Sequence, residues 1–143
     1  MTAKFAPKAS SVKAGDVLPV LVSEPITRTT LALYAGASGD HNPMHIDSDF
    51  AKRAGESDVF AHGMLSMAYL SRALLGYVPQ SAVRSFGVRF ASIVRVGETV
   101  TCTGRVTETF EAGGETRARL ELTAATSKGV VALKGEAVVA LAV

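Results

Sequence analysis

The segment that most constrains the fold is a helical stretch, Gly63 to about Tyr77, with almost no polar side. Only Ser66, Ser71 and Arg72 interrupt its apolar character. A helix that is apolar all round is expected to be buried all round. At about 1.5 Å per residue it is roughly 20 Å long, which is comparable to a strand in a sheet. The rest of the chain must therefore supply a cover for this helix.

The second half of the chain supplies that cover, because it alternates between apolar and polar residues as strands do. Ala112-Gly113-Gly114 and Lys128-Gly129 mark turns between these strands. We predict an α+β fold in which an antiparallel sheet curls around one central helix. The predicted strands are Val83–Val96, Glu98–Phe110, Arg117–Thr126 and Val130–Val143, with Ala118, Leu120, Leu122 and Ala124 facing inward.

The first half is predicted to hold short elements around an irregular loop. A first strand is expected over 18–26, where Pro19 and Pro25 limit its length. Thr27 is a candidate N-cap for a helix that ends at Gly36 and Gly39. A short helix is expected over 47–54, and residues 1–15 are expected to form a loose polar arm before one domain at 16–143.

Composition excludes several classes of function. Fifteen basic and thirteen acidic residues are scattered along the chain, so no nucleic-acid partner is expected. No apolar run reaches the length of about 20 residues that a membrane span needs. The single cysteine, Cys102, cannot form a disulfide within one chain and lies in an alternating strand pattern. We therefore expect it in the core of a cytoplasmic protein.

All three histidines, His41, His45 and His62, lie in the irregular segment between the two longer helices. Asp40-His41-Asn42-Pro43 is typical of a turn, since a residue before proline is biased away from the helix. Loops held by a rigid scaffold commonly carry the residues that handle ligands. This segment is the candidate site.

The run Tyr34-Ala35-Gly36-Ala37-Ser38-Gly39-Asp40-His41-Asn42-Pro43-Met44-His45 closely resembles the signature of the MaoC-like, R-specific enoyl-CoA hydratases. That signature is a small residue, Gly, Asp, any residue, Asn, Pro, an aliphatic residue and His. Residues 61–65, 88–90, 94–98 and 135–139 resemble further landmarks of the family, and the likeness covers about 16–142. Bacterial 3-hydroxyacyl-acyl-carrier-protein dehydratases look similar. The resemblance implies a hot-dog fold, in which an antiparallel sheet wraps a long helix.

The resemblance also implies an activity, that of a hydro-lyase that reversibly hydrates trans-2-enoyl thioesters to (R)-3-hydroxyacyl thioesters. It assigns activation of water and proton movement to Asp40 and His45. The turn at Pro43 allows both side chains to enter one site, which a regular helix does not do at a spacing of five. Histidine also changes charge near neutral pH, which suits acid–base catalysis.

The remaining roles concern the thioester. Gly63 stands at the start of the central helix, where unpaired N–H groups and the helix dipole stabilise a negative oxygen. The resemblance gives it that oxyanion role and places Ser71 nearby as an orienting hydroxyl. Asn42 is expected to fix the active loop. Met64 and Arg89 are expected to contact substrate.

Structural interpretations compete with each of these assignments. Asp40 and Asn42 could build an Asx-turn, and His45 could be a satisfied core histidine. His62 could cap or brace the helix that follows it. Gly63 could be an ordinary helix-start glycine and Ser71 an incidental core hydroxyl.

A metal centre is not expected. His-x-x-x-His can bind zinc on a helix, which would recruit Asp40, His41 and His45. Asn42-Pro43 argues against such a helix, and no fourth ligand is evident.

No cofactor is expected, since coenzyme A or the carrier's pantetheine arm belongs to the substrate, an acyl-CoA or acyl-carrier-protein thioester. The family resemblance implies a homodimer whose sheets join. Two rival interpretations are a non-catalytic scaffold subunit in a heterodimer and a hot-dog thioesterase, because fold does not determine function. The intact Asp-x-Asn-Pro-x-His motif argues against both.

Overall fold

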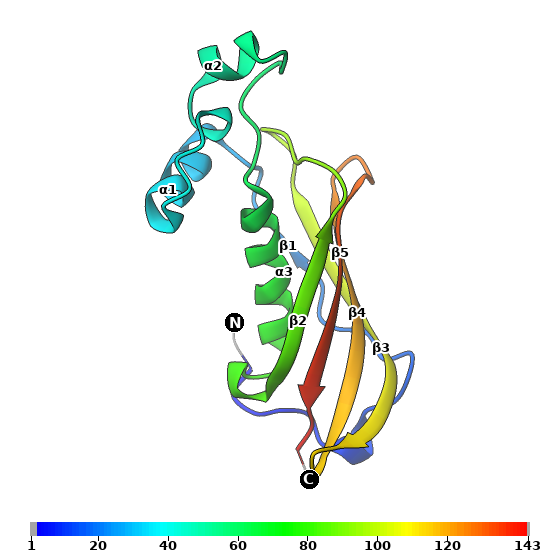
Figure 1. The fold of residues 1–143 in the computed structure, drawn as a ribbon. Coiled ribbons are helices and arrows are strands. Elements are labelled where there is room, and N and C mark those ends of the chain that lie inside the picture. The colour runs from blue at the N-terminus through cyan, green and yellow to red at the C-terminus, as the bar shows by residue number, and fades with distance from the viewer. Residues whose placement is uncertain (1–2, 143) are drawn as a thin grey trace.

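Helix α3 (Gly63–Tyr77) runs along the inner face of a curved antiparallel sheet in the computed structural model, which describes residues 3–142 (Figure 1). The sheet order is β1-β3-β4-β5-β2. The helix begins and ends at the residues predicted from its apolar pattern, and the predicted α+β hot-dog arrangement is confirmed. The strands are β1 (Leu21–Val22), β2 (Val83–Phe90), β3 (Val100–Ala112), β4 (Glu115–Thr126) and β5 (Val131–Ala140).

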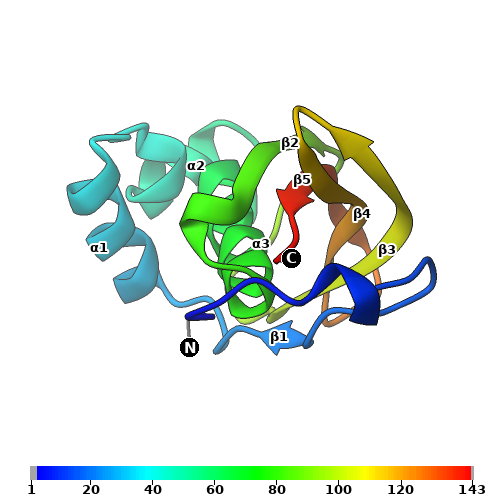
Figure 2. The ribbon, with the colours of Figure 1, turned by 90° about the horizontal axis from the view of Figure 1, so that it is seen from below.

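The core lies between α3 and the inward side chains of the sheet. Leu70 and Leu74 are buried on the helix, opposite Leu120 and Leu122 of β4. The expectation that the helix is buried all round is wrong for the single chain, because Met64 is 52% exposed. The sheet covers one side of the helix, and its other side is only partly covered (Figure 2).

The hairpin between β3 and β4 follows the predicted alternation. Gly113 and Gly114 both have positive φ, at 59° and 75°, as a two-residue type I′ turn requires. All four residues predicted to face inward on β4 are buried: Ala118, Leu120, Leu122 and Ala124.

Three predicted strands are shorter than expected. Of the strand expected over 18–26, only β1 is regular, because Pro19 and Pro25 have no N–H to donate to a ladder. Individual hydrogen bonds still connect this segment to β3. For example, the N–H of Ser23 donates to the carbonyl of Val100 at 2.9 Å. The strand predicted over 83–96 ends at Phe90. The strand predicted over 130–143 is also shorter, because β5 covers Val131–Ala140, and Val143 lies outside the described residues.

The segment expected to be a loose arm is held in place from residue 3 onward. The N–H of Ala9 donates to the carbonyl of Ala142, and that of Ala142 donates to Pro7, both at 2.8 Å. A short 3₁₀ helix, η1 (Ala9–Ser11), follows, and Val12 is buried in the core. The N-terminal segment crosses the end of the sheet (Figure 2). Met1 and Thr2 lie outside the described residues, and the division into 1–15 and 16–143 stays a prediction.

Two helices lie beyond one end of α3 and shape the loop that carries the histidines (Figure 1). Helix α1 (Arg28–Ser38) begins after Thr27, whose hydroxyl accepts from the N–H of Thr30. It ends at Gly39, with φ 75°, so Gly36 is inside the helix. The 3₁₀ helix η2 (Pro43–His45) and helix α2 (Ser48–Arg53) follow, and another 3₁₀ helix, η3 (Gln80–Ala82), precedes β2. Over residues 3–142, no helix combines the length and apolar character needed to cross a membrane.

Candidate active site

Asp40 follows the glycine that ends α1 and begins a tight turn. Its Oδ1 accepts from the N–H of Asn42 at 3.2 Å, and Asn42 Oδ1 accepts from the N–H of Met44 at 3.1 Å. The Asx-turn interpretation is therefore correct for both residues, and Asn42 fixes the turn as expected. It does not conflict with a chemical role, because the second carboxylate oxygen of Asp40 takes no part in the turn.

His45 ends the η2 turn and is 8% exposed. Its Nδ1 lies 2.7 Å from the carbonyl oxygen of Phe60, which can only accept, so Nδ1 carries the hydrogen. Nε2 is then an acceptor that can take a proton. Phe60 is itself held by a bond from its N–H to Met44 at 3.4 Å, and its ring meets the imidazole edge to face at 5.2 Å.

His62 immediately precedes α3 and is 1% exposed. Its Nε2 lies 3.1 Å from the main-chain carbonyl oxygen of Asp40, so Nε2 donates. Its ring stacks on His45 with centroids 4.0 Å apart and also meets Tyr34 in an edge contact at 4.9 Å. The other ring nitrogen, Nδ1, is buried without a hydrogen-bond partner among the described residues.

The loop thus gathers Asp40, His45 and His62, whose potential ligand atoms all lie within 4.8 Å of one another. A metal ion binds an imidazole nitrogen near the plane of its ring. The two rings are stacked with an angle of 28° between their planes, so their in-plane lone pairs do not converge on one ion. The stacked rings are therefore poorly placed to chelate one ion. The absence of a metal requirement stays a prediction.

A pocket of about 400 Å³ opens beside His45. Gly63 and Ser66 of α3 line it, together with Phe90 at the end of β2 and Leu133 of β5. A Cβ added at Gly63 would lie 2.9 Å from ring atoms of Phe90, so the glycine lets this ring pack closely against the start of α3. The pocket therefore brings a ring nitrogen able to accept a proton beside the start of a helix, within a largely apolar lining.

The structure does not bring two of the predicted residues to this pocket. The hydroxyl of Ser71 donates to the carbonyl of Ala68 within its own helix, and Met64 points largely to solvent. Ser71 lies eight residues beyond Gly63, which is about 12 Å along the helix axis, whereas Ser66 is about 4.5 Å along it. Ser66 is buried and lines the pocket, a residue that sequence reasoning missed although helical spacing from Gly63 could have indicated it.

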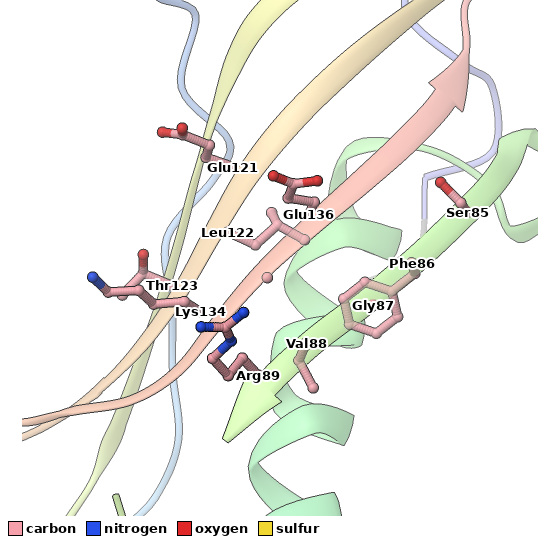
Figure 3. Close-up of a pocket in the computed structure, with 11 residues that line it drawn as sticks. Ser85, Phe86, Gly87, Val88, Arg89, Glu121, Leu122, Thr123, Lys134 and Glu136 are labelled. Atoms are coloured by element: carbon pink, nitrogen blue, oxygen red, sulfur yellow. The ribbon is translucent and has the colours of Figure 1, made fainter. Parts of the chain in front are cut away.

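Arg89 lines a different and larger hollow of about 930 Å³ on the opposite face of the sheet (Figure 3). A Cβ on Gly135 would point toward Leu70 of α3, so its neighbours Lys134 and Glu136 face outward, and Arg89 lies opposite Lys134 in the register. Charged residues of both signs line this hollow. It contains no residue of the histidine cluster, so its larger volume does not make it the catalytic pocket. Substrate contact by Arg89 stays a prediction.

The buried position of His62 predicts a pH dependence of stability. Burial lowers the pKa of His62, the bond to Asp40 partly offsets this, and nearby His45 lowers it further. The unfolded chain therefore binds a proton at a higher pH than the folded one, and the stability present above about pH 6.5 is lost as the pH falls. Urea unfolding at pH 7.5 and 5.0 is expected to show a larger loss for the parent than for His62→Gln. Equal losses in the two proteins would contradict this assignment.

Comparisons with known proteins identify the family of the chain. The model of the family described as "MaoC like domain" matches residues 12–129. The (R)-specific enoyl-CoA hydratase of Rhodospirillum rubrum is 35% identical over 82% of this chain and 81% of its own length. Two further curated relatives are longer, and the chain spans about a third of each.

Solved structures show the same fold. The unliganded R-hydratase PhaJ1 from Pseudomonas aeruginosa superposes with a TM-score of 0.81 at 27% identity, covering 94% of this chain and 85% of that one. The (R)-hydratase from A. caviae involved in PHA biosynthesis has a TM-score of 0.77 at 30% identity, covering 93% and 99%.

Proposed function

This chain belongs to the family of MaoC-like domains, and from that membership we propose that it reversibly hydrates trans-2-enoyl thioesters to (R)-3-hydroxyacyl thioesters. It is a hydro-lyase of the hydratase and dehydratase type. The observation that carries the proposal is the convergence of Asp40 and His45 beside a pocket whose wall includes the start of α3. The substrate is proposed to be an acyl-CoA or acyl-carrier-protein thioester.

The chemistry of hydration suits this arrangement. A water oxygen bonds to C3 of the enoyl group and loses a proton, while C2 gains a proton. Nε2 of His45 is free to accept a proton because Nδ1 already donates to Phe60. The carboxylate of Asp40 is available to orient the water and the imidazole. We assign the proton transfers to this pair, an effect typically worth about 10²–10⁴ in rate.

The thioester oxygen carries negative charge between these two events. Gly63 is the first residue of α3, where N–H groups lack intrahelical partners and the helix end carries a partial positive charge. We propose that its N–H binds the developing oxyanion. Loss of one such donor typically costs about 10²–10³ in rate. The hydroxyl of Ser66 lies in the same pocket and is our candidate for the orienting role first assigned to Ser71.

The direct test is hydration of crotonyl-CoA by the purified chain. Loss of the conjugated enoyl-thioester absorbance, with 3-hydroxybutyryl-CoA as product in the R configuration, is the expected result. Release of free thiol instead would indicate a thioesterase. A well-folded chain that acts on neither short nor long enoyl thioesters would reject the proposal and indicate a scaffold subunit.

We further propose that two copies form a homodimer through strand β2. This strand is the outer edge of the sheet and pairs only with β5 within the described residues, which leaves its other edge without a ladder. Phe90 at its end and the nearby Ile93 are exposed apolar side chains beside the pocket. Sedimentation is expected to give twice the chain mass. A monomer in solution would contradict the homodimer, and one that pairs with a different hot-dog chain would indicate a heterodimer.

The cellular location is proposed from the cysteine. Cys102 is free and fully buried, and burial raises the pKa of its thiol to about 11. The thiol is therefore a core group that needs no oxidising compartment. We propose a cytoplasmic location, which fractionation of the producing cells tests.

A further inference from the structure

We infer that His62 is a positioning residue for the acid–base pair: its Nε2–H and its ring face hold the main chain of Asp40 and the imidazole of His45 in one arrangement. This inference rests on the proposed function, because it concerns how the same pair is kept in place. Sequence reasoning left His62 as a cap or brace of the helix. The structure shows no side-chain capping bond from His62 to α3.

The first contact that supports this role is the bond to Asp40. Among the described residues, no group other than His62 donates a hydrogen bond to the Asp40 carbonyl. Asp40 is exposed and lies just after Gly39, whose left-handed conformation ends α1. The bond therefore ties an otherwise exposed turn to the buried start of α3. A shift of this carbonyl would move the Asp40 carboxylate relative to His45, although the two groups now lie within 4.8 Å of each other.

The second contact is the stack on His45. The bond from Nδ1 of His45 to Phe60 fixes one point of its ring but leaves rotation about that bond open. The His62 ring covers one face of the imidazole at 4.0 Å, and the Phe60 ring meets it edge to face at 5.2 Å. These two contacts together limit the direction in which Nε2 of His45 can point.

The unpartnered nitrogen of His62 argues against a purely space-filling role. Nδ1 is buried and unsatisfied among the described residues, and a buried acceptor without a partner is destabilising. An apolar side chain of similar size would fill the same space without that cost. The property that only a histidine supplies here is a flat ring with a donor at Nε2.

Two amide substitutions separate the donor from the rest of the side chain. In His62→Gln the amide nitrogen is as many bonds from Cβ as Nε2 is, so it can still donate to Asp40. In His62→Asn the amide nitrogen matches Nδ1 and cannot reach. We expect kcat for crotonyl-CoA to fall about 10- to 100-fold in His62→Asn, which loses both the donor and the ring, because small misplacement costs this much. We expect a smaller fall, of about three- to tenfold, in His62→Gln, which loses only the ring, with KM little changed in both.

The control is His41→Gln in the same loop, an exposed residue with no assigned role, which is expected to keep parental kcat. Melting temperatures of all variants show whether a loss of kcat merely follows a loss of folding. Equal kcat in His62→Gln and His62→Asn, whether at the parental level or equally reduced, would overturn the inference.

A second measurement does not depend on catalysis. It therefore separates the positioning role of His62 from the proposed hydratase function. Side-chain ¹⁵N NMR reports which nitrogen of His45 carries the hydrogen. The Nδ1–H form is expected to dominate in the parent and to lose that dominance in His62→Gln and His62→Asn alike, because neither keeps the ring that stacks on His45. If the parent hydrates no enoyl thioester but this dependence on residue 62 holds, the proposed function fails and the positioning stands. If His45 is the same in all three proteins, the positioning fails.

Discussion

Replacing Asp40 by Asn or His45 by Gln is expected to lower kcat for crotonyl-CoA hydration by about two decades or more, since each removes a group that moves or directs a proton. Asp40→Asn keeps an oxygen that can accept from the N–H of Asn42, so the turn is expected to survive. His45→Gln keeps a polar side chain but cannot take up a proton. Steady-state rates measured beside circular dichroism spectra check the prediction.

The matched control for both substitutions is again His41→Gln, because residue 41 stands between the two proposed catalytic positions and is exposed. It is expected to keep parental kcat. Full activity in a folded Asp40→Asn protein would contradict the assignment of Asp40. Full activity in folded His45→Gln would do the same for His45.

Replacing Leu70 by Ala is expected to lower the free energy of unfolding by about 2–5 kcal/mol, because it removes a fully buried side chain and leaves a cavity. Leu70 projects from α3 toward the sheet, where its Cδ2 would lie 3.5 Å from a Cβ built on Gly135. Its removal therefore leaves an empty space between α3 and β5. Urea denaturation at pH 7.5 measures the change.

Leu33→Ala is the control for this substitution. Leu33 lies on α1 and is 71% exposed, and leucine and alanine both favour helices. Its free energy of unfolding is expected to stay within about 0.5 kcal/mol of the parent, as for most surface substitutions. Comparable losses in the two variants would show that Leu70 is not a core residue.

The elements predicted most accurately are those whose sequence pattern is local. Helix α3 begins at Gly63 and ends at Tyr77 as predicted, and the inward residues of β4 were all identified. Both follow from a periodicity that neighbouring side chains impose. The segments predicted least accurately are 18–26 and 83–96. In both, the regular pairing between strands covers fewer residues than the apolar pattern does.

The candidate site likewise contains residues that a local pattern predicts and residues that depend on packing. The short turn from Asp40 to His45 could be located because a few adjacent residues carry its geometry and its resemblance to a family. Ser66 and Ser71 could not be told apart by residue type, since both are serines of one apolar helix. Their difference depends on which turn of that helix reaches the pocket, and that depends on the packing of α3 against the sheet.

The chain's order of residues was enough to establish a central helix, an antiparallel sheet and the turn that holds Asp40 and His45, because these depend on spacing along a short stretch. Only the tertiary structure revealed that His62 stacks on His45, that Arg89 lies on the far face of the sheet and that one side of α3 remains partly uncovered. Contacts between residues distant in the chain arise from how helices and strands pack, and no local pattern records that packing.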